Sequence, residues 1–262
     1  MISAVVTRSL ADRRRGVLGY GIGLGLMIVW VMAIYPGVEK ELSDYIDAMP
    51  DTMKSLFGME DITSLAGFVH AEIFSLMGPL VFIALAITAA AGALAGEERD
   101  RILPIVLSTG IGRGPLLLSK LAALAITLGA LGALTLGSLL IGLVLAGGGF
   151  GLAAATAATV QLAALGLFFG TLTFALGATT GKKTLASGTA VGVALATYLV
   201  DALANLVGWL GPFELLSPFH WYAPGNPLVN GISITGLSLL AACTAIFAVV
   251  AVVAFDRRDV AA

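Results

Sequence analysis

The residues able to do chemistry in this sequence are few, and they form no familiar catalytic pattern. The two histidines, His70 and His220, fall in connections between apolar stretches and cannot form a buried histidine cluster. The chain has neither a His-Glu-x-x-His zinc motif nor a Gly-x-Ser-x-Gly nucleophile elbow. The serine of ASGT (186–189) has no histidine in its own apolar stretch to activate it. We therefore expect no catalytic residue, metal site or bound cofactor in this chain.

The segment LGATTGKKT (176–184) is similar to a phosphate-binding loop only at first sight. That motif requires glycine five positions before its Gly-Lys pair and serine or threonine after it. Leu176 and Lys183 occupy these two positions here. The segment also joins two apolar stretches rather than a strand and a helix, so we read it as a turn. If the protein uses ATP, another chain must bind it.

Composition decides the class of protein that must position these residues. The chain is 58% hydrophobic and 11% charged, with a mean hydropathy of +1.00, whereas soluble domains carry roughly 25% charged residues. Several apolar runs reach about 20 residues, the length that a helix needs to cross about 30 Å of hydrocarbon. The net charge is −2 and Lys and Arg are sparse, so the chain lacks the positive charge that binding to nucleic-acid phosphates requires. We predict an all-α integral membrane protein that does not bind nucleic acid.

Six helical spans fit the hydropathy within a single transmembrane domain, 1–262. They lie at about 17–35, 71–95, 116–146, 151–178, 186–207 and 231–255, and they must be helices because lipid cannot satisfy backbone polar groups. The remaining segments are a basic entry helix, two outer segments and a link after the second span, at 1–16, 36–70, 208–230 and 96–115. The third and fourth spans are joined by GGGFG (147–151), whose glycines permit the positive φ angles of a tight hairpin.

The basic residues are distributed unevenly across the membrane. Lys40 and Lys54 lie on one side, and every other lysine and arginine lies at or near the opposite ends of the spans. Because positive charges favour cytoplasmic segments, we predict a multi-pass protein of the plasma or inner membrane with both termini in the cytoplasm. The link 96–115 is then cytoplasmic as well.

That link, AGEERDRILPIVLSTGIGRGP (95–115), begins with the densest charged run of the chain. Its residues are Glu97, Glu98, Arg99, Asp100 and Arg101. Anchoring of the helix ends would explain the arginines, but acidic residues contribute little to topology. The acids therefore need another explanation.

The two outer segments are more than linkers. From Val38 to Phe57, apolar residues recur at three- and four-residue steps, which indicates an amphipathic helix that Pro50 divides into two. Four prolines exclude one continuous helix in 205–231, and its aromatic residues suit the membrane interface. We expect a re-entrant or surface hairpin before the last span.

Asp201 is the one acid clearly inside a predicted span, and Asn205 follows one turn later. An intramembrane carboxylate is a functional candidate, although this shallow position also fits a wetted interfacial group. Glu214, Phe219 and His220 lie in the next connection. These five residues either line a transport pathway or outer gate, or simply face water.

The order of these segments resembles permeases of the ABC type 2 exporter family. AGEERDRILPIVLSTGIGRGPLLLSK (95–120) is similar to the cytoplasmic segment after their second span. SLADRRRGVLGYGIGLGL (9–26) looks like their basic entry helix and first span. AIYPG (33–37) and AMPDTMKSLFG (48–58) are similar to the outer segment of the antibiotic-exporter branch, and LSPFHWYAPGNPLVNG (216–231) to the entry of the last span. Together these pieces cover most of the chain.

The resemblance implies that 96–115 holds a coupling helix, which docks in a groove of a partner ATPase. The charged run would meet the ATPase, and an apolar set would pack into its groove or against the membrane ends: Ile102, Leu103, Val106 and Leu107. Acids at a helix start are also favoured by the helix dipole. Pro104 stands where the family usually has a helix former, so the helix is kinked or begins later.

The resemblance further implies a complex of two permease units and two ATPase copies. This chain would supply one permease, and a second copy or a sister permease the other, with ATP and magnesium bound by the ATPase. The substrate would be hydrophobic or amphipathic, such as a drug, an antibiotic or a lipid. One alternative is a stand-alone secondary transporter or channel, which normally shows intramembrane charges and inverted repeats. The other, an intramembrane enzyme, is disfavoured by the missing catalytic patterns.

Overall fold

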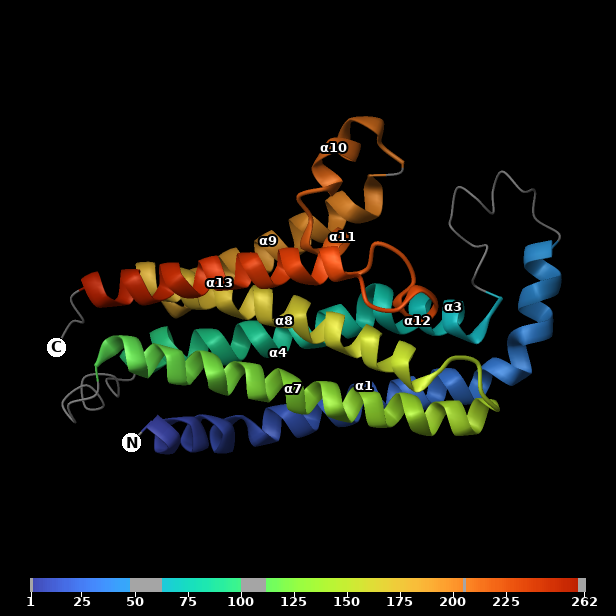
Figure 1. The fold of residues 1–262 in the computed structure, drawn as a ribbon, viewed down its shortest axis with the longest axis horizontal. Coiled ribbons are helices and arrows are strands. Elements are labelled where there is room, and N and C mark those ends of the chain that lie inside the picture. The colour runs from blue at the N-terminus through green and yellow to red at the C-terminus, as the bar shows by residue number, and fades with distance from the viewer. Residues whose placement is uncertain (1, 48–62, 100–111, 205, 259–262) are drawn as a thin grey trace.

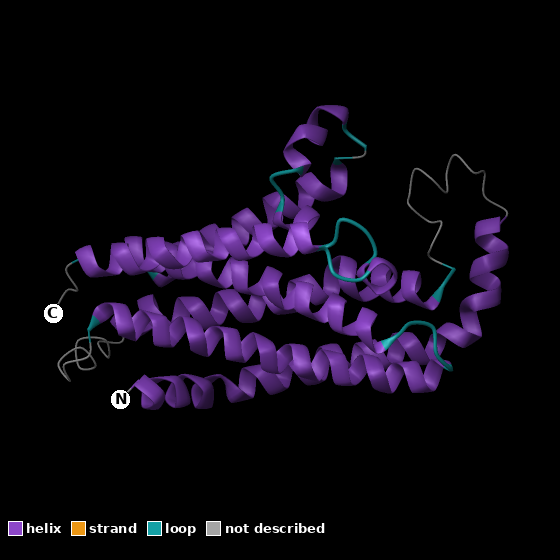
Figure 2. Ribbon diagram, viewed as in Figure 1, coloured by secondary structure: helices purple, strands orange, loops and turns teal. Residues whose placement is uncertain are grey.

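The computed structural model describes residues 2–47, 63–99, 112–204 and 206–258, and in these residues every regular element is helical. Six of the helices are long and apolar enough to span a membrane. Their spans are Arg13–Glu41, Leu65–Gly96, Arg113–Ala146, Leu152–Thr180, Lys183–Leu203 and Ile234–Arg257. They run side by side along the long axis of the molecule (Figures 1 and 2). The predicted all-α class with six spans is confirmed.

The first span belongs to a single 46-residue helix, α1 (Ile2–Asp47), which contains Pro36. The sequence divided this region into an entry helix, a span and the start of an outer segment, whereas the structure joins all three. A proline inside a helix removes one hydrogen bond and bends the axis without ending the helix. Figure 1 shows α1 turning away from the bundle in its last part. Pro50 and the second predicted outer helix lie outside the described residues.

The second span is one helical rod built from α-helical and π-helical pieces. It runs through α3 (Leu65–Val69), η2 (His70–Met77), α4 (Gly78–Ala91), η3 (Gly92–Gly96) and α5 (Glu97–Arg99). Ser64 caps its start, because its Oγ accepts a hydrogen bond of 3.0 Å from the Gly67 amide. The rod therefore starts several residues before the predicted position at 71 and carries the two acids at its far end.

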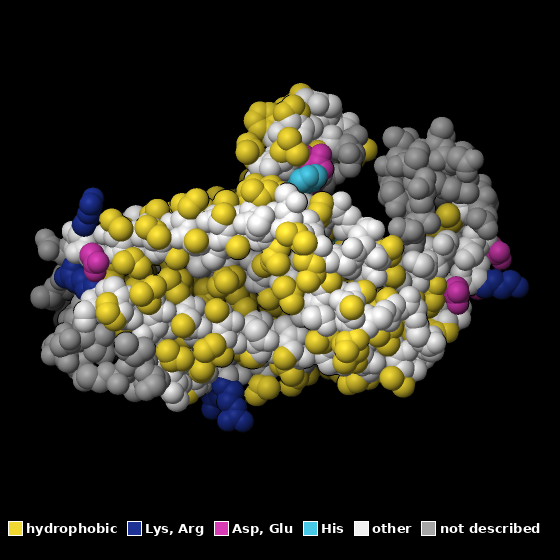
Figure 3. All heavy atoms as spheres, in the orientation of Figure 1, with side chains coloured by type: hydrophobic (Ala, Val, Ile, Leu, Met, Phe, Trp, Pro, Cys, Tyr) yellow, Lys and Arg dark blue, Asp and Glu magenta, His cyan; other side chains and the backbone are white. Residues whose placement is uncertain are grey.

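The core forms around α8 (Leu152–Thr180), which contacts α4, α7 (Arg113–Ala146), α9 (Lys183–Leu203) and α13 (Ile234–Arg257). Phe169, Phe174 and Leu165 of α8 are fully buried. By contrast, in the apolar 18-residue stretch of each helix that could span the membrane, only 11% of α9 and 11% of α13 is buried inside the chain, against 56% of α8. The helices α9 and α13 thus keep apolar faces that this chain leaves uncovered. Figure 3 shows hydrophobic side chains along most of the visible bundle.

The turn between α7 and α8 is the predicted glycine hairpin. Gly147, Gly148 and Gly149 have φ angles of 79°, 108° and 139°, which L-residues with side chains rarely adopt. A Cβ atom on Gly149 would lie 2.6 Å from Cδ2 of Leu65, at the start of the second-span rod. The glycine run therefore permits both the turn and the close approach of the rod.

Replacing Gly149 by alanine is expected to destabilise the protein by about 2–3 kcal/mol, since backbone strain and a steric clash act together. The melting temperature of the purified protein in detergent measures this effect. Gly147→Ala is the control for a positive-φ glycine in the same turn, because no atom beyond its immediate chain neighbours lies within 4 Å of the added methyl group. Equal melting temperatures for the two variants would contradict the close approach to Leu65.

The segment before α13 folds into short helices, η4 (Gly208–Leu210), α10 (Gly211–Glu214), α11 (Pro218–Tyr222) and α12 (Pro227–Asn230). Three of its prolines stand in the first turn of a short helix, where no backbone hydrogen bond is lost. Figure 1 shows the α10 part standing away from the bundle and the chain returning to it at α11. We call residues 208–230 the hairpin segment.

Buried polar contacts fasten the base of the hairpin segment. Gln161 of α8 donates to the Tyr222 carbonyl at 2.9 Å and accepts from the Ser233 amide at 2.5 Å. The Tyr222 hydroxyl donates to the Phe74 carbonyl at 3.1 Å. Burial raises the pKa of Tyr222, so its hydroxyl remains a donor. The base of the hairpin segment is therefore a fixed part of the bundle.

Candidate functional site

Two polar clusters lie at different places on the bundle. We call the first the helix-end cluster, formed by Glu97, Glu98, Arg113, Lys120 and Arg258. It lies at the end where α1 begins and α13 finishes (Figure 1). The second, the hairpin cluster, is formed by Asp201, Glu214 and His220.

Lys120 of α7 binds the end of the second-span rod. Its side chain is 2% exposed, and its Nζ lies 2.6 Å from Oε1 of Glu97 and donates to the Ala93 carbonyl at 2.6 Å. A buried ammonium group is tolerated only when a counter-charge and hydrogen bonds replace its water. Glu97 therefore compensates Lys120 and ties the rod to α7.

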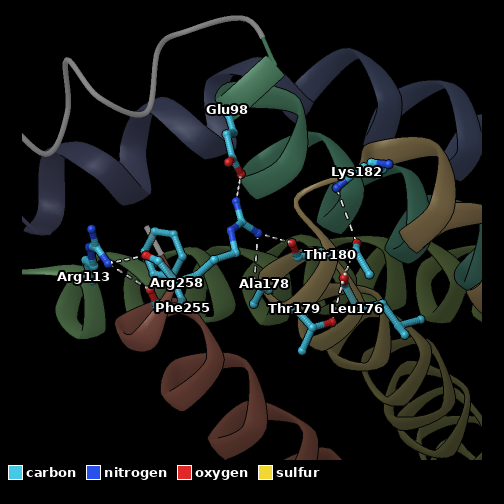
Figure 4. Close-up of polar contacts among 10 residues, drawn as sticks. Glu98, Arg113, Leu176, Ala178, Thr179, Thr180, Lys182, Phe255 and Arg258 are labelled. Atoms are coloured by element: carbon cyan, nitrogen blue, oxygen red, sulfur yellow. Dashed lines mark hydrogen bonds and ion pairs between the residues drawn. The ribbon is translucent and has the colours of Figure 1, made fainter. Parts of the chain in front are cut away.

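Arg258, just after α13, connects three helices (Figure 4). Its Nη2 donates to Oε2 of Glu98 in an ion pair. Its Nη1 donates to the carbonyls of Gly177 and Ala178 in the last turn of α8, at 3.1 and 2.9 Å. A guanidinium group at a helix C-terminus stabilises the partial negative charge of the last carbonyls. Glu98 is thus linked through one side chain to the ends of α8 and α13.

Arg113, at the start of α7, completes the helix-end cluster. Its Nη1 donates to the carbonyls of Phe255, Asp256 and Arg258 at 3.3, 3.2 and 2.6 Å. Its guanidinium carbon also lies 6.0 Å from the centre of the Phe255 ring. The first turn of α7 therefore holds the end of α13, and the whole cluster joins α5, α7, α8 and α13.

The predicted coupling residues are only partly within the described chain. Glu97 and Glu98 continue the second-span rod directly from η3, so they do not begin a new helix as the sequence analysis expected. The two acids are therefore stabilised by their basic partners, Lys120 and Arg258, and not by the dipole of a helix N-terminus. Arg99 is the last described residue of α5, and the other predicted coupling residues lie outside the described residues: Asp100, Arg101, Ile102, Leu103, Val106 and Leu107, together with Pro104.

Sequence reasoning missed the basic members of the helix-end cluster, which it counted only as topological charges. Two signals were present. The acids Glu97 and Glu98 had no topological role, and Lys120 fell inside the predicted span 116–146, where an unpaired ammonium group is costly. Both signals favour pairing between these groups.

The turn that is similar to a phosphate-binding loop lies beside Glu98. Gly181 ends α8 with a φ angle of 67°, and Lys182 precedes α9, so the segment joins two helices as predicted. An open pocket of about 700 Å³ lies here. It is lined by Glu98, Gly181, Lys182, Lys183, Thr184, Leu185, Gly188 and Thr189. The lining of the recess therefore carries one acidic residue, Glu98, and two basic residues, Lys182 and Lys183.

The hairpin cluster brings together three of the five residues predicted to line an outer gate. Nδ1 of His220 in α11 lies 2.9 Å from Oε1 of Glu214 in α10 and 3.8 Å from Oδ1 of Asp201 in α9. All three side chains are about one-third exposed or slightly less. Figure 3 shows a histidine against acidic side chains at the base of the projecting part.

The other two gate residues do not join the hairpin cluster. Phe219 is buried, with its ring centre 5.4 Å from that of Tyr198 and 5.9 Å from that of Phe169. Phe219 also contributes to an apolar groove of about 280 Å³ between the second-span rod and α9. Asn205 lies outside the described residues.

Comparison with known protein families gives one match that covers nearly the whole chain. Residues 3–260 match the family described as "ABC-2 family transporter protein". Among curated proteins, no similar relative was found.

Proposed function

This chain belongs to the ABC-2 family of transporter proteins, and we propose that it is the membrane permease subunit of an ATP-driven exporter. The observation that carries the proposal is the family match over residues 3–260, together with six apolar helices able to span a membrane. The chain itself supplies the passage, and a separate ATPase subunit, present in two copies, binds ATP and magnesium.

The helix-end cluster gives the coupling role a physical basis. In this proposal its end of the bundle faces the cytoplasm, in agreement with the distribution of basic residues. Residues 96–115 then dock on the ATPase. Because Glu97 and Glu98 are tied to α7, α8 and α13, displacement of the docked segment would move several helices together. The open recess beside Glu98 supports a docking surface next to this link.

A second permease unit completes the passage in the proposed complex. The helices α9 and α13 bury little of their apolar membrane-spanning stretches within the chain. The exposed side chains of α9 include Leu185, Val191, Leu195 and Leu199. Such faces meet either lipid or a second permease, which is another copy of this chain or a sister subunit.

The proposed substrate is hydrophobic or amphipathic, such as a drug, an antibiotic or a lipid. The groove between the second-span rod and α9 supports this choice, because aliphatic and aromatic side chains dominate its lining: Leu76, Pro79, Leu80, Ile83, Leu195 and Tyr198 among others. An apolar lining favours apolar surface over strongly hydrated solutes.

Purification with the candidate ATPase tests the partnership. The full-length chain and an ATPase encoded beside it are produced together, and only the permease carries an affinity tag. We expect a complex with two ATPase copies for every two permease units, measured by light scattering with quantitative amino-acid analysis. A permease that purifies alone and transports an amphiphile without ATP would support the secondary-transporter alternative.

A further inference from the structure

We propose that the hairpin cluster, Asp201, Glu214 and His220, is a binding site for a divalent transition-metal ion, with Zn²⁺ as the best fit. The sequence analysis expected no metal site, because it searched for histidine pairs at fixed spacing. The structure instead brings one histidine and two carboxylates together from α9, α10 and α11.

The distances within the hairpin cluster suit a small cation. One ligand atom from each residue can be chosen so that all three lie within 4.8 Å of one another. Bonds of about 2.0–2.1 Å to a tetrahedral zinc ion place neighbouring ligand atoms about 3.3 Å apart. The observed distances from His220 Nδ1, 2.9 and 3.8 Å, lie on either side of that value. Small rotations of partly exposed side chains would close the site around an ion.

The types of ligand select the metal. Calcium and magnesium prefer sets of oxygen ligands, whereas an imidazole nitrogen with two carboxylate oxygens suits zinc and its transition-metal neighbours. Three protein ligands leave a fourth position of a tetrahedral ion for water. The site is therefore of the open, three-ligand kind.

The charge of the hairpin cluster also favours a cation. Two carboxylates lie beside a single imidazole, and in the described part of the chain no lysine or arginine forms an ion pair with Asp201 or Glu214. Even a protonated His220 leaves an excess negative charge, and neighbouring carboxylates repel each other. A divalent ion would remove both the repulsion and the excess charge.

The backbone that carries the ligands is held in place. Ser217 accepts a hydrogen bond from the Phe219 amide at the start of α11 and donates to the Thr197 carbonyl of α9 at 2.9 Å. Trp221 donates from Nε1 to the Leu215 carbonyl at 2.8 Å, which joins α11 to the end of α10. These contacts fix His220 beside α9 before any ion binds, as ligand sites require. A bound ion would then connect α10 to α9 and stabilise the hairpin segment.

Zinc binding to the full-length chain tests the proposal without ATP or transport, so its result is independent of the proposed exporter function. The protein is purified in detergent with a histidine-free tag, treated with a chelator and titrated with ZnCl₂ by calorimetry. We expect one equivalent of Zn²⁺ per chain and a higher melting temperature in its presence. His220→Gln, Asp201→Asn and Glu214→Gln should each weaken binding at least about tenfold.

Two variants outside the hairpin cluster serve as matched controls. His70→Gln removes the other histidine, and Asp44→Asn neutralises an exposed acid of α1; both should bind Zn²⁺ as the unmodified protein does. X-ray absorption at the zinc edge of the unmodified complex should show one imidazole and otherwise oxygen ligands, a readout that needs no variant to fold. Absence of stoichiometric binding, unchanged binding in all three cluster variants, or a zinc ion with sulfur or two imidazoles would overturn the proposal.

Discussion

Glu98→Arg is expected to uncouple ATP hydrolysis from transport in the assembled complex. The substitution replaces the ion pair between Glu98 and Arg258 with two like charges, and Arg258 also binds the last carbonyls of α8. Loss of one such link changes a coupling equilibrium by about 1–3 kcal/mol, which corresponds to roughly 5- to 150-fold. The measured quantity is substrate transported per ATP hydrolysed, in vesicles that contain both subunits.

Glu41→Arg is the matched control for this uncoupling. It makes the same change of charge on an exposed residue of α1, at the end of the first span that lies away from the helix-end cluster. It should leave the ratio of transport to hydrolysis unchanged. If Glu98→Arg also leaves that ratio unchanged in a correctly assembled complex, the link through Arg258 has no part in coupling.

Lys120→Met is expected to lower the stability of the folded chain by about 2–3 kcal/mol. The substitution leaves Glu97 without its counter-charge in a partly buried position, and breaking a buried pair on one side costs 3–5 kcal/mol when the remaining group is fully desolvated. The value here is lower because Glu97 is 27% exposed. Thermal unfolding in detergent measures the loss, and Lys40→Met on the exposed part of α1 should have little effect.

The double variant Glu97→Gln/Lys120→Met should recover part of this stability. Removing both charges eliminates the uncompensated group, and methionine retains most of the buried volume of lysine. The two effects are therefore expected to be non-additive, as for residues in direct contact. A double variant whose loss equals the sum of the two single losses would show that the residues act independently.

The sequence predicted the fold class and the number of spans because both follow from composition and run length. Apolar stretches of about 20 residues have few alternatives to membrane helices. The turn at 147–151 was also predictable, since three consecutive glycines with positive φ angles need no distant contact. The short helices of 208–230 agree with its four prolines, which exclude one long helix there.

The positions of helix ends were harder to predict. The hydropathy ends the first span at about 35, yet α1 continues through Pro36 to Asp47, because a kinked helix keeps its remaining hydrogen bonds. Glu97 and Glu98 were expected near the start of a helix, whereas they extend the second-span rod. Local sequence does not decide between one bent helix and two short ones.

The partners of the charged residues could not be read from the sequence. Glu98 and Arg258 are 160 positions apart, and their contact depends on how the second-span rod and α13 both pack against α8. Likewise, Asp201, Glu214 and His220 were each singled out, but their convergence depends on the fold of the hairpin segment. The sequence therefore identified candidate residues, and the structure supplied the pairs and clusters that they form.

Transport by the reconstituted complex tests the central claim most directly. Vesicles contain this chain with the candidate ATPase, and accumulation of a fluorescent amphiphile is followed after addition of ATP and magnesium. We predict accumulation that requires both subunits and stops when a non-hydrolysable ATP analogue replaces ATP. Accumulation by the permease alone, driven by an ion gradient and indifferent to ATP, would contradict the account.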